Sequence, residues 1–242
     1  MDLRGVRHLA IIMDGNGRWA EARGQIRSRG HRAGVDAVRE VVTECARAHL
    51  PWLTLYALST ENFRQRPSLE VHTLMALLRR FMINERPTLM ENAVRLVTAG
   101  RLHELPPRVL AEIRRTEALT ANNRGTTLCL ALNYGGRGEL VDAAQAIARE
   151  ARAGRLNPED IDEAALAQRM YCPSMPDVDL LIRTAGDLRV SNFLLWQISY
   201  AEIFVTSMCW PDVRRPLLEE AFGEYARRDR RFGGVQGGGA AS

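Results

Sequence analysis

Lysine is absent from this chain, and all 33 of its basic residues are arginine. Enzymes that depend on a P-loop lysine, a Schiff-base lysine or lysine-bound pyridoxal phosphate are therefore excluded. Acidic residues number 29, which leaves a formal net charge of +4. Because acidic residues accompany the arginines nearly one for one, no basic face with interleaved aromatic residues is indicated. We expect no nucleic-acid partner.

The chain also has few cysteines and no long apolar run. Its cysteines lie far apart without a C-x-x-C pair, so neither a zinc site nor a disulfide framework is indicated. They are Cys45, Cys129, Cys172 and Cys209. The longest apolar runs, such as residues 53–58 and 178–182, are far shorter than the ~20 residues of a membrane span, and the N-terminus lacks a signal-peptide core. We expect a cytoplasmic protein with reduced cysteines in its core.

Apolar strand-like segments alternate with segments of helical periodicity along the whole chain, which is typical of an α/β fold. The predicted strands are residues 8–13, 52–58, 94–98, 126–132, 178–182 and a sixth that opens at Glu202. The predicted helices include residues 31–49, 68–82, 107–121, 162–170 and 216–228. We expect one α/β domain over residues 1–234 with a central, largely parallel six-stranded sheet flanked by helices, followed by a disordered glycine-rich tail at residues 235–242.

The first predicted strand ends abruptly in Asp14-Gly15-Asn16-Gly17-Arg18. Its glycines allow the backbone to approach a ligand closely, the carboxylate can hold a divalent cation, and the arginine offers a planar fork to a phosphate. An ordinary D-G-N-G turn explains the same residues equally well. This segment alone therefore does not decide between a turn and a metal-diphosphate site.

Polar clusters follow the other strands as well. Ser59 and Asn62 follow the second strand, Asn133 follows the fourth, and Arg183 and Arg189 follow the fifth. The carboxyl ends of parallel strands share one edge of a sheet, so we expect these clusters to converge. Arg183 directly abuts an apolar strand, where a charge needs a partner such as phosphate. Convergence favours the metal-diphosphate site over an isolated turn.

Three further segments border this expected site. Residues 23–31 are rich in arginine and are predicted to form a lid or a loop at the site edge. Because side chains alternate along a strand, Ala57 is expected to share a face with Ser59, one step deeper. The apolar helix at residues 68–82 either lines a hydrophobic cavity or is an ordinary core helix.

Six stretches that span residues 6–234 resemble the cis-prenyltransferases, the undecaprenyl diphosphate synthase-like isoprenyl transferases. They are HLAIIMDGNGRWA, GHRAG, LTLYALSTEN, EALTANNRGTTLCLALNYGGRGEL, DLLIRTAGDLRVSNFLLWQISYAEI and RRFGG. The resemblance implies Mg²⁺-dependent elongation of an allylic diphosphate, with farnesyl diphosphate expected, by isopentenyl diphosphate. It also implies a homodimer whose subunits each hold a hydrophobic product tunnel, with peripheral membrane contact through the lipid product as an open possibility.

The resemblance assigns roles to individual residues. Asp14 would engage Mg²⁺ and help the allylic diphosphate to leave, and Glu202 would help to place the ion. The allylic diphosphate would be held by Gly15, Asn16, Gly17, Arg18, Arg27 and His31. The diphosphate of isopentenyl diphosphate would be held by Arg183, Arg189 and Ser191, with Arg231 and Gly233 reaching in from the second subunit. The reacting prenyl groups would be bordered by Trp19, Ser59, Asn62 and Phe63, and further substrate-binding residues would be Thr60, Glu61 and Arg66.

Some roles remain open at this point. Asn62 is a catalytic candidate, but Asn62 and Ser59 are weak bases, so a released diphosphate oxygen is an equal candidate for taking the C2 proton. The family usually has Trp in place of Phe63 and one residue fewer before the following proline, so either Arg64 or Arg66 fills the loop arginine position.

Other departures from the family pattern concern neighbours of the fifth strand and the product. Ala185 stands where Ser or Gly is common and Asp187 where Glu is usual, so the affinity for isopentenyl diphosphate is expected to differ. Ala57 is small, as in family members that make long products, and predicts a product of about undecaprenyl size. A short- or medium-chain synthase is the first alternative.

Two other protein classes are weaker matches. A non-catalytic partner subunit of such an enzyme would lack the aspartate motif, which is present here as Asp14. A phosphatase with an aspartate nucleophile after a strand requires D-x-D and a lysine, whereas this chain has Asn16 at the second position and no lysine.

Overall fold

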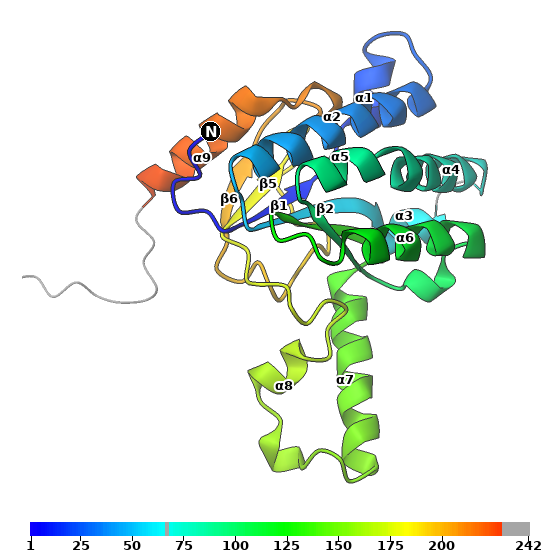
Figure 1. Ribbon diagram of the computed structural model, residues 1–242, viewed down its shortest axis with the longest axis vertical. Coiled ribbons are helices and arrows are strands. Elements are labelled where there is room, and N and C mark those ends of the chain that lie inside the picture. Colours follow the sequence, from blue (N-terminus) through cyan, green and yellow to red (C-terminus); the bar gives the residue numbers. More distant parts are fainter. Residues whose placement is uncertain (66–67, 229–242) are drawn as a thin grey trace, which may run out of the picture.

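The computed structural model describes residues 1–65 and 68–228 and contains a six-stranded sheet in which all neighbouring strands are parallel (Figure 1). The strand order is β3-β4-β2-β1-β5-β6. The strands are β1 (His8–Ile12), β2 (Trp52–Ser59), β3 (Arg95–Ala99), β4 (Thr127–Tyr134), β5 (Leu180–Arg183) and β6 (Glu202–Val205). The expected α/β sheet is confirmed, and its order reverses beside β1, the kind of switch point at which such sheets bind ligands.

Four helices cover one face of the sheet. They are α2 (Arg27–Arg47), α4 (Ser68–Asn84), α6 (Pro107–Thr120) and α9 (Arg215–Arg227). Leu9 and Ile11 of β1 belong to the core beneath these helices, whereas Ala10 and Ile12 belong to a second core on the opposite face. The irregular segments 171–178 and 190–201, on either side of β5, pack on that second face, and Phe193 is fully buried there. The two cores follow directly from the alternation of side chains along buried parallel strands.

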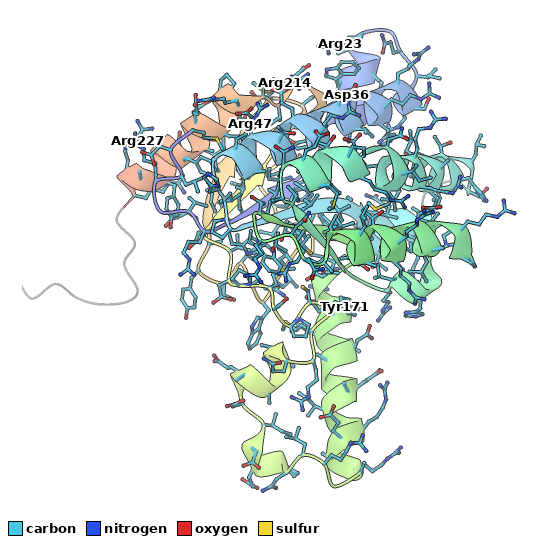
Figure 2. All side chains as sticks on the ribbon, viewed as in Figure 1. Arg23, Asp36, Arg47, Tyr171, Arg214 and Arg227 are labelled. Atoms are coloured by element: carbon cyan, nitrogen blue, oxygen red, sulfur yellow. The ribbon has the colours of Figure 1, made fainter. Side chains whose placement is uncertain are left out.

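The remaining helices are short or lie at the margins of the sheet. They are α1 (Asn16–Glu21), α3 (Thr60–Gln65), α5 (Arg86–Glu91), α7 (Gly136–Arg152) and α8 (Glu163–Ala167), with 3-10 turns η1 (Leu102–Glu104), η2 (Pro158–Asp160) and η3 (Trp210–Asp212). Helices α7 and α8 project from the body as an arm (Figure 1). Tyr171 lies where this arm leaves the body, and its hydroxyl contacts Asp142 of α7 (Figure 2).

Several helix boundaries differ from the sequence-based expectations. The arginine-rich segment 27–31 was expected to be a loop, but it is the first turn of α2. A Cβ on Gly30 would lie 1.9 Å from the Asn16 carbonyl oxygen, so this turn packs directly on α1. The expected helix at residues 162–170 ends earlier, at Ala167. Asn157 caps a 3-10 turn, where its side chain accepts from the Glu159 amide at 3.4 Å.

A β-bulge interrupts β2 at Ala57. Tyr56 pairs with Ala131 and Leu58 with Leu132 of β4, so Ala57 is the extra residue. The regular alternation of side chains along β2 is therefore interrupted at Ala57. Bulges re-aim side chains, and Ala57 is exposed although its neighbours Tyr56 and Leu58 are buried.

The other expectations concern the cysteines and the chain as a whole. All four cysteines are free, with Cys45, Cys129 and Cys172 buried and Cys209 half-buried. In residues 1–65 and 68–228, no helix is both long and apolar enough to cross a membrane. The predicted tail at residues 235–242 lies outside the described residues.

Candidate functional site

Asp14 and Arg183 meet at the carboxyl ends of the adjacent strands β1 and β5. The Arg183 side chain is only 3% exposed, and its Nη2 lies 3.0 Å from Asp14 Oδ2. Its Nη1 donates to Ser191 Oγ at 2.7 Å and to the Arg189 carbonyl oxygen. Its Nε has no hydrogen-bond partner among the described residues. One buried guanidinium therefore joins the turn after β1 to the loop after β5.

Thr184 fixes the backbone of Asp14. Its hydroxyl accepts from the Asp14 amide at 2.8 Å and donates to the Asp14 carbonyl oxygen at 2.7 Å. Gly15 follows with φ of 97°, and a Cβ there would lie 2.8 Å from the Cβ of Ala185. The two turns thus pack closely enough that residue 15 must be glycine. The sequence reading missed Thr184, although its position next to Arg183 was the available signal.

Asp187 forms ion pairs with three arginines of the site. Its Oδ2 lies 3.3 Å from Arg18, 3.4 Å from Arg183 and 2.9 Å from Arg189. Desolvation alone would raise the pKa of Asp187, but Arg189, Arg18 and Arg183 together lower it below its usual value. A single carboxylate therefore holds three cationic side chains where the resemblance predicts a diphosphate. The sequence reading noted Asp187 only as a departure from the family pattern.

A polar cavity of about 560 Å³ lies over the carboxyl ends of β1, β2 and β5. This volume falls within the ~300–1,000 Å³ of small-molecule sites. Most of the predicted site residues line it, namely Asp14, Asn16, Gly17, Arg27, His31, Ser59, Glu61, Asn62, Arg183, Arg189 and Ser191. Tyr56 and Asn192 also line the cavity but were not predicted as site residues. The expected convergence of the strand ends is present in the structure.

Several predicted residues lie elsewhere. Trp19 does not border the cavity, because its Nε1 donates to Asp212 at 2.7 Å and its ring lies under the guanidinium of Arg23, at 4.2 Å. Figure 2 shows Arg23 near α1 at the margin of the molecule. Phe63 packs against the main core, and Arg18 donates to the Ala185 carbonyl oxygen at 2.7 Å. Gly15 and Thr60 are not among the cavity residues either.

Asn133, after β4, supports the fold rather than the cavity. Its side-chain Nδ2 donates to the Arg101 carbonyl oxygen at 3.2 Å and to the Glu104 carboxylate at 2.9 Å, and the residue is fully buried. It therefore anchors η1. The expectation that Asn133 joins the site was wrong, because its left-handed φ of 46° turns the chain toward η1.

Glu202 lies at the amino end of the strands, whereas Asp14 lies beyond the carboxyl end of β1. It opens β6, where it pairs with Leu180 at the level of Leu9, and its carboxylate bonds Arg228 at 2.8 Å. The structure therefore does not bring the two predicted metal ligands together within one protomer. The predicted residues Arg66, Arg231 and Gly233 lie outside the described residues, and Arg64 lies 3.6 Å from Glu104.

A second, apolar cavity of about 130 Å³ adjoins the polar one. It is lined by Leu74, Leu77, Leu78 and Phe81 of α4, which favours the cavity-lining alternative for this helix. Ala57 and His31 line both cavities, and His31 Nε2 lies 3.4 Å from Glu70 at the start of α4. The bulge at Ala57 therefore lies where the polar and apolar spaces meet.

The chain is similar to known proteins both in sequence and in structure. Residues 12–233 match the family model described as "Putative undecaprenyl diphosphate synthase". An isoprenyl transferase of Heliobacterium mobile is 49% identical over 95% of this chain and 88% of that protein. A ditrans,polycis-undecaprenyl-diphosphate synthase of Pectobacterium atrosepticum, specific for (2E,6E)-farnesyl diphosphate, is 47% identical over 97% of this chain and 92% of that protein. The crystal structure of lavandulyl diphosphate synthase from Lavandula x intermedia in complex with dimethylallyl diphosphate superposes with a TM-score of 0.92 at 35% identity, covering 96% of this chain and 100% of that one.

Proposed function

This chain belongs to the undecaprenyl diphosphate synthase family of isoprenyl transferases, and from that membership we propose that it joins isopentenyl diphosphate to an allylic diphosphate, with farnesyl diphosphate as the primer. The product is a long-chain polyprenyl diphosphate. The single observation that carries the proposal is the pairing of a polar cavity, with cationic groups on two sides, and an apolar cavity that meets it at Ala57.

The polar cavity offers two places for a diphosphate. Asp14, Arg27 and His31 line the side formed by the turn after β1 and by α2, where the allylic diphosphate would bind and leave. Arg183 and Arg189 line the side formed by the loop after β5, where the diphosphate of isopentenyl diphosphate would remain. Fixed cations near a leaving group stabilise the charge that develops there, which is the main contribution that this reaction needs from the protein.

Asp14 fits a magnesium site. Its carboxylate is about one-third exposed and lines the cavity, and Mg²⁺ in such enzymes binds one or two carboxylates together with substrate phosphates. Among the described residues no three His, Cys, Asp or Glu side chains form a metal cluster, so the substrate would supply the other ligands. Glu202 cannot join Asp14 within one protomer. When bound, the ion would offset the charge of the departing diphosphate.

The carbon chemistry would take place between these two sides. Asn62 and Ser59 line the cavity there, and the backbone N–H of Asn62 donates to Ser59 Oγ at 3.0 Å. Both side chains are weak bases, so a diphosphate oxygen stays a candidate for the C2 proton. The growing prenyl chain would extend past Ala57 toward α4. The apolar cavity of about 130 Å³ is small for such a product, so α4 would have to move aside.

Other features remain predictions. A homodimer, a cytoplasmic location and membrane contact through the product follow from the resemblance and the composition, and so does the preference for a long product. A short-chain synthase is the alternative, since lavandulyl diphosphate synthase has the same fold.

The proposal is tested with purified protein, Mg²⁺, farnesyl diphosphate and labelled isopentenyl diphosphate, followed by chromatography of the extracted lipids. We expect products of many additions, and products of one or two additions would refute the long-chain assignment. Asp14→Ala should nearly abolish turnover while leaving the protein folded, because Arg183 keeps its ion pair with Asp187. Undiminished prenyl transfer by this variant would refute the assignment of the site.

A further inference from the structure

Asn192 lies in a strained part of the loop after β5. Its φ is +60°, and Ser191 and Leu194 have φ values of +48° and +44°. Left-handed backbone at residues other than glycine is disfavoured and persists where surrounding contacts hold it, often at functional sites. Asparagine tolerates this region better than most residues. The contacts of Asn192 therefore indicate which function the strained backbone serves.

The Asn192 side chain joins two other elements. Its Oδ1 accepts from the Arg137 amide at the start of α7, at 2.8 Å, and its backbone carbonyl oxygen accepts from the Gly136 amide at 2.7 Å. Its Nδ2 donates to Glu61 Oε1 of α3 at 2.9 Å. The oxygen of the side-chain amide thus bonds the start of α7, and its nitrogen bonds Glu61 of α3, which lines the same cavity.

Helix α3 follows β2 directly and packs Phe63 against the main core. It has six residues, and none of them is buried. Burial alone would raise the pKa of Glu61, but the hydrogen bond from Asn192 and other local contacts lower it, so Glu61 is ionised at neutral pH. The bond from Asn192 is therefore charge-assisted and of the stronger class. Another tether of α3 is the exposed pair Arg64–Glu104 at 3.6 Å, a contact of the weak kind.

We propose that Asn192 is a positioning residue that couples the diphosphate-binding loop after β5 to α3, so that Asn62 and Ser59 are held over the cavity when that loop is in place. Asn192 lies next to Ser191, which Arg183 holds at 2.7 Å. A diphosphate bound by Arg183 and Ser191 would thus fix the residue that also holds Glu61. The proposal rests on the proposed function only for the identity of this diphosphate.

The test moves the hydrogen-bond donor from residue 192 to residue 61 by two substitutions. Asn192→Asp keeps the acceptor for the Arg137 amide, the side-chain size and the tolerance of left-handed backbone, but it places two carboxylates face to face. Adding Glu61→Gln restores the hydrogen bond in reverse, with the glutamine amide donating to the new carboxylate. Glu61→Gln alone retains an acceptor for Asn192 Nδ2. Asn157→Asp is the matched control, because Asn157 is an exposed cap where aspartate serves equally well.

We expect kcat of Asn192→Asp to fall about 10- to 100-fold, the range that follows from loss of one charge-assisted hydrogen bond. The KM for isopentenyl diphosphate should change less than about 3-fold, because the Arg137 bond still holds the loop. The double variant should recover to within about 3-fold of the unsubstituted protein, with Glu61→Gln between the two and Asn157→Asp unchanged. A double variant no more active than Asn192→Asp, or a loss confined to KM, would overturn the proposal.

Hydrogen exchange supplies a readout that does not depend on activity. In the substrate-free protein, amides of residues 60–65 should exchange faster in Asn192→Asp and return to their original rate in the double variant. Unchanged exchange of α3 in Asn192→Asp would contradict the coupling, even if prenyl transfer were impaired. Conversely, faster exchange that the double variant reverses would support the coupling even if isopentenyl diphosphate proved not to be the substrate.

Discussion

Arg183→Met is the substitution that most directly separates function from stability in this fold. Arg183 is a buried cation whose Nε has no partner in the described part of the chain, and Met replaces it with an unbranched apolar side chain of similar length. Removing one partner of a buried ion pair is normally destabilising, because the other charge is left alone. Here both carboxylate partners keep other contacts. Asp187 retains Arg189 at 2.9 Å, and Asp14 retains the Gly15 amide at 2.7 Å.

The opposing contributions to stability are of similar size. Loss of the donor to Ser191 and to the Arg189 carbonyl oxygen costs about 1 kcal/mol each, and both acceptors lie at the cavity, where water can replace the donor. Removal of the unpaired N–H relieves a desolvation penalty of about 1–3 kcal/mol. We therefore expect the free energy of unfolding to change by no more than about 1 kcal/mol. For a chain of this length that is a shift of about 2–4 °C in Tm.

The effect on activity should be much larger. If two N–H groups of Arg183 bond the diphosphate of isopentenyl diphosphate, their loss removes at least about 3 kcal/mol, which lowers kcat/KM more than about 100-fold. Arg189→Met is the matched control, because this side chain is 62% exposed and should cost only about 10-fold. The measurements are steady-state kinetics and thermal unfolding of substrate-free protein. A fall in Tm of about 10 °C with unchanged kcat/KM would show that Arg183 is structural and refute the reasoning.

Three other predictions follow from the same geometry. Ala57→Leu should shorten the product, because Ala57 lies where the two cavities meet; an unchanged product distribution on chromatography would contradict this. EDTA should abolish turnover and added Mg²⁺ should restore it, and full activity in excess chelator would exclude the cation at Asp14. Burial lowers the pKa of His8 to about 4, below the 6.5 of an unfolded chain, so the unfolded state binds a proton that the folded state does not. Stability should therefore be complete above pH 6.5 and fall by about 3 kcal/mol as the pH drops to 4, and denaturant titrations of His8→Gln should lack most of this slope.

The convergence of Asp14 and Arg183 could be predicted from sequence, because it follows from strand direction alone. Both residues follow buried strands, and parallel strands place such residues at one edge whatever their order. The same reasoning failed for Asn133, which also follows a buried strand. Its side chain turns to η1 through a backbone conformation that depends on contacts with Arg101 and Glu104, about 30 residues away in the chain.

Other parts of the site depend on pairing between distant segments. The bulge at Ala57 exists only in the register of β2 against β4, which the local alternation of residues along β2 does not reveal. Helix α3 has no apolar periodicity, so its six residues gave no helical signal. Trp19 was assigned to the prenyl groups from the resemblance, whereas its hydrogen bond to Asp212 is nearly 200 residues distant in sequence. Each of these features depends on a contact that tertiary structure creates.

The two halves of the site are not independent, because Arg183 serves both. Its Nη2 holds Asp14 while its Nη1 holds Ser191, and Asp187 neutralises it together with Arg18 and Arg189. A diphosphate bound by Arg183 and Ser191 would compete with Asp14 for the Arg183 guanidinium. The Asp14 carboxylate would then be freer to bind a cation. Binding at one half should therefore favour binding at the other, and by thermodynamic linkage the effect is reciprocal. Asp187 pairs with the three arginines at the place where the proposed diphosphate, an anion of higher charge, would bind.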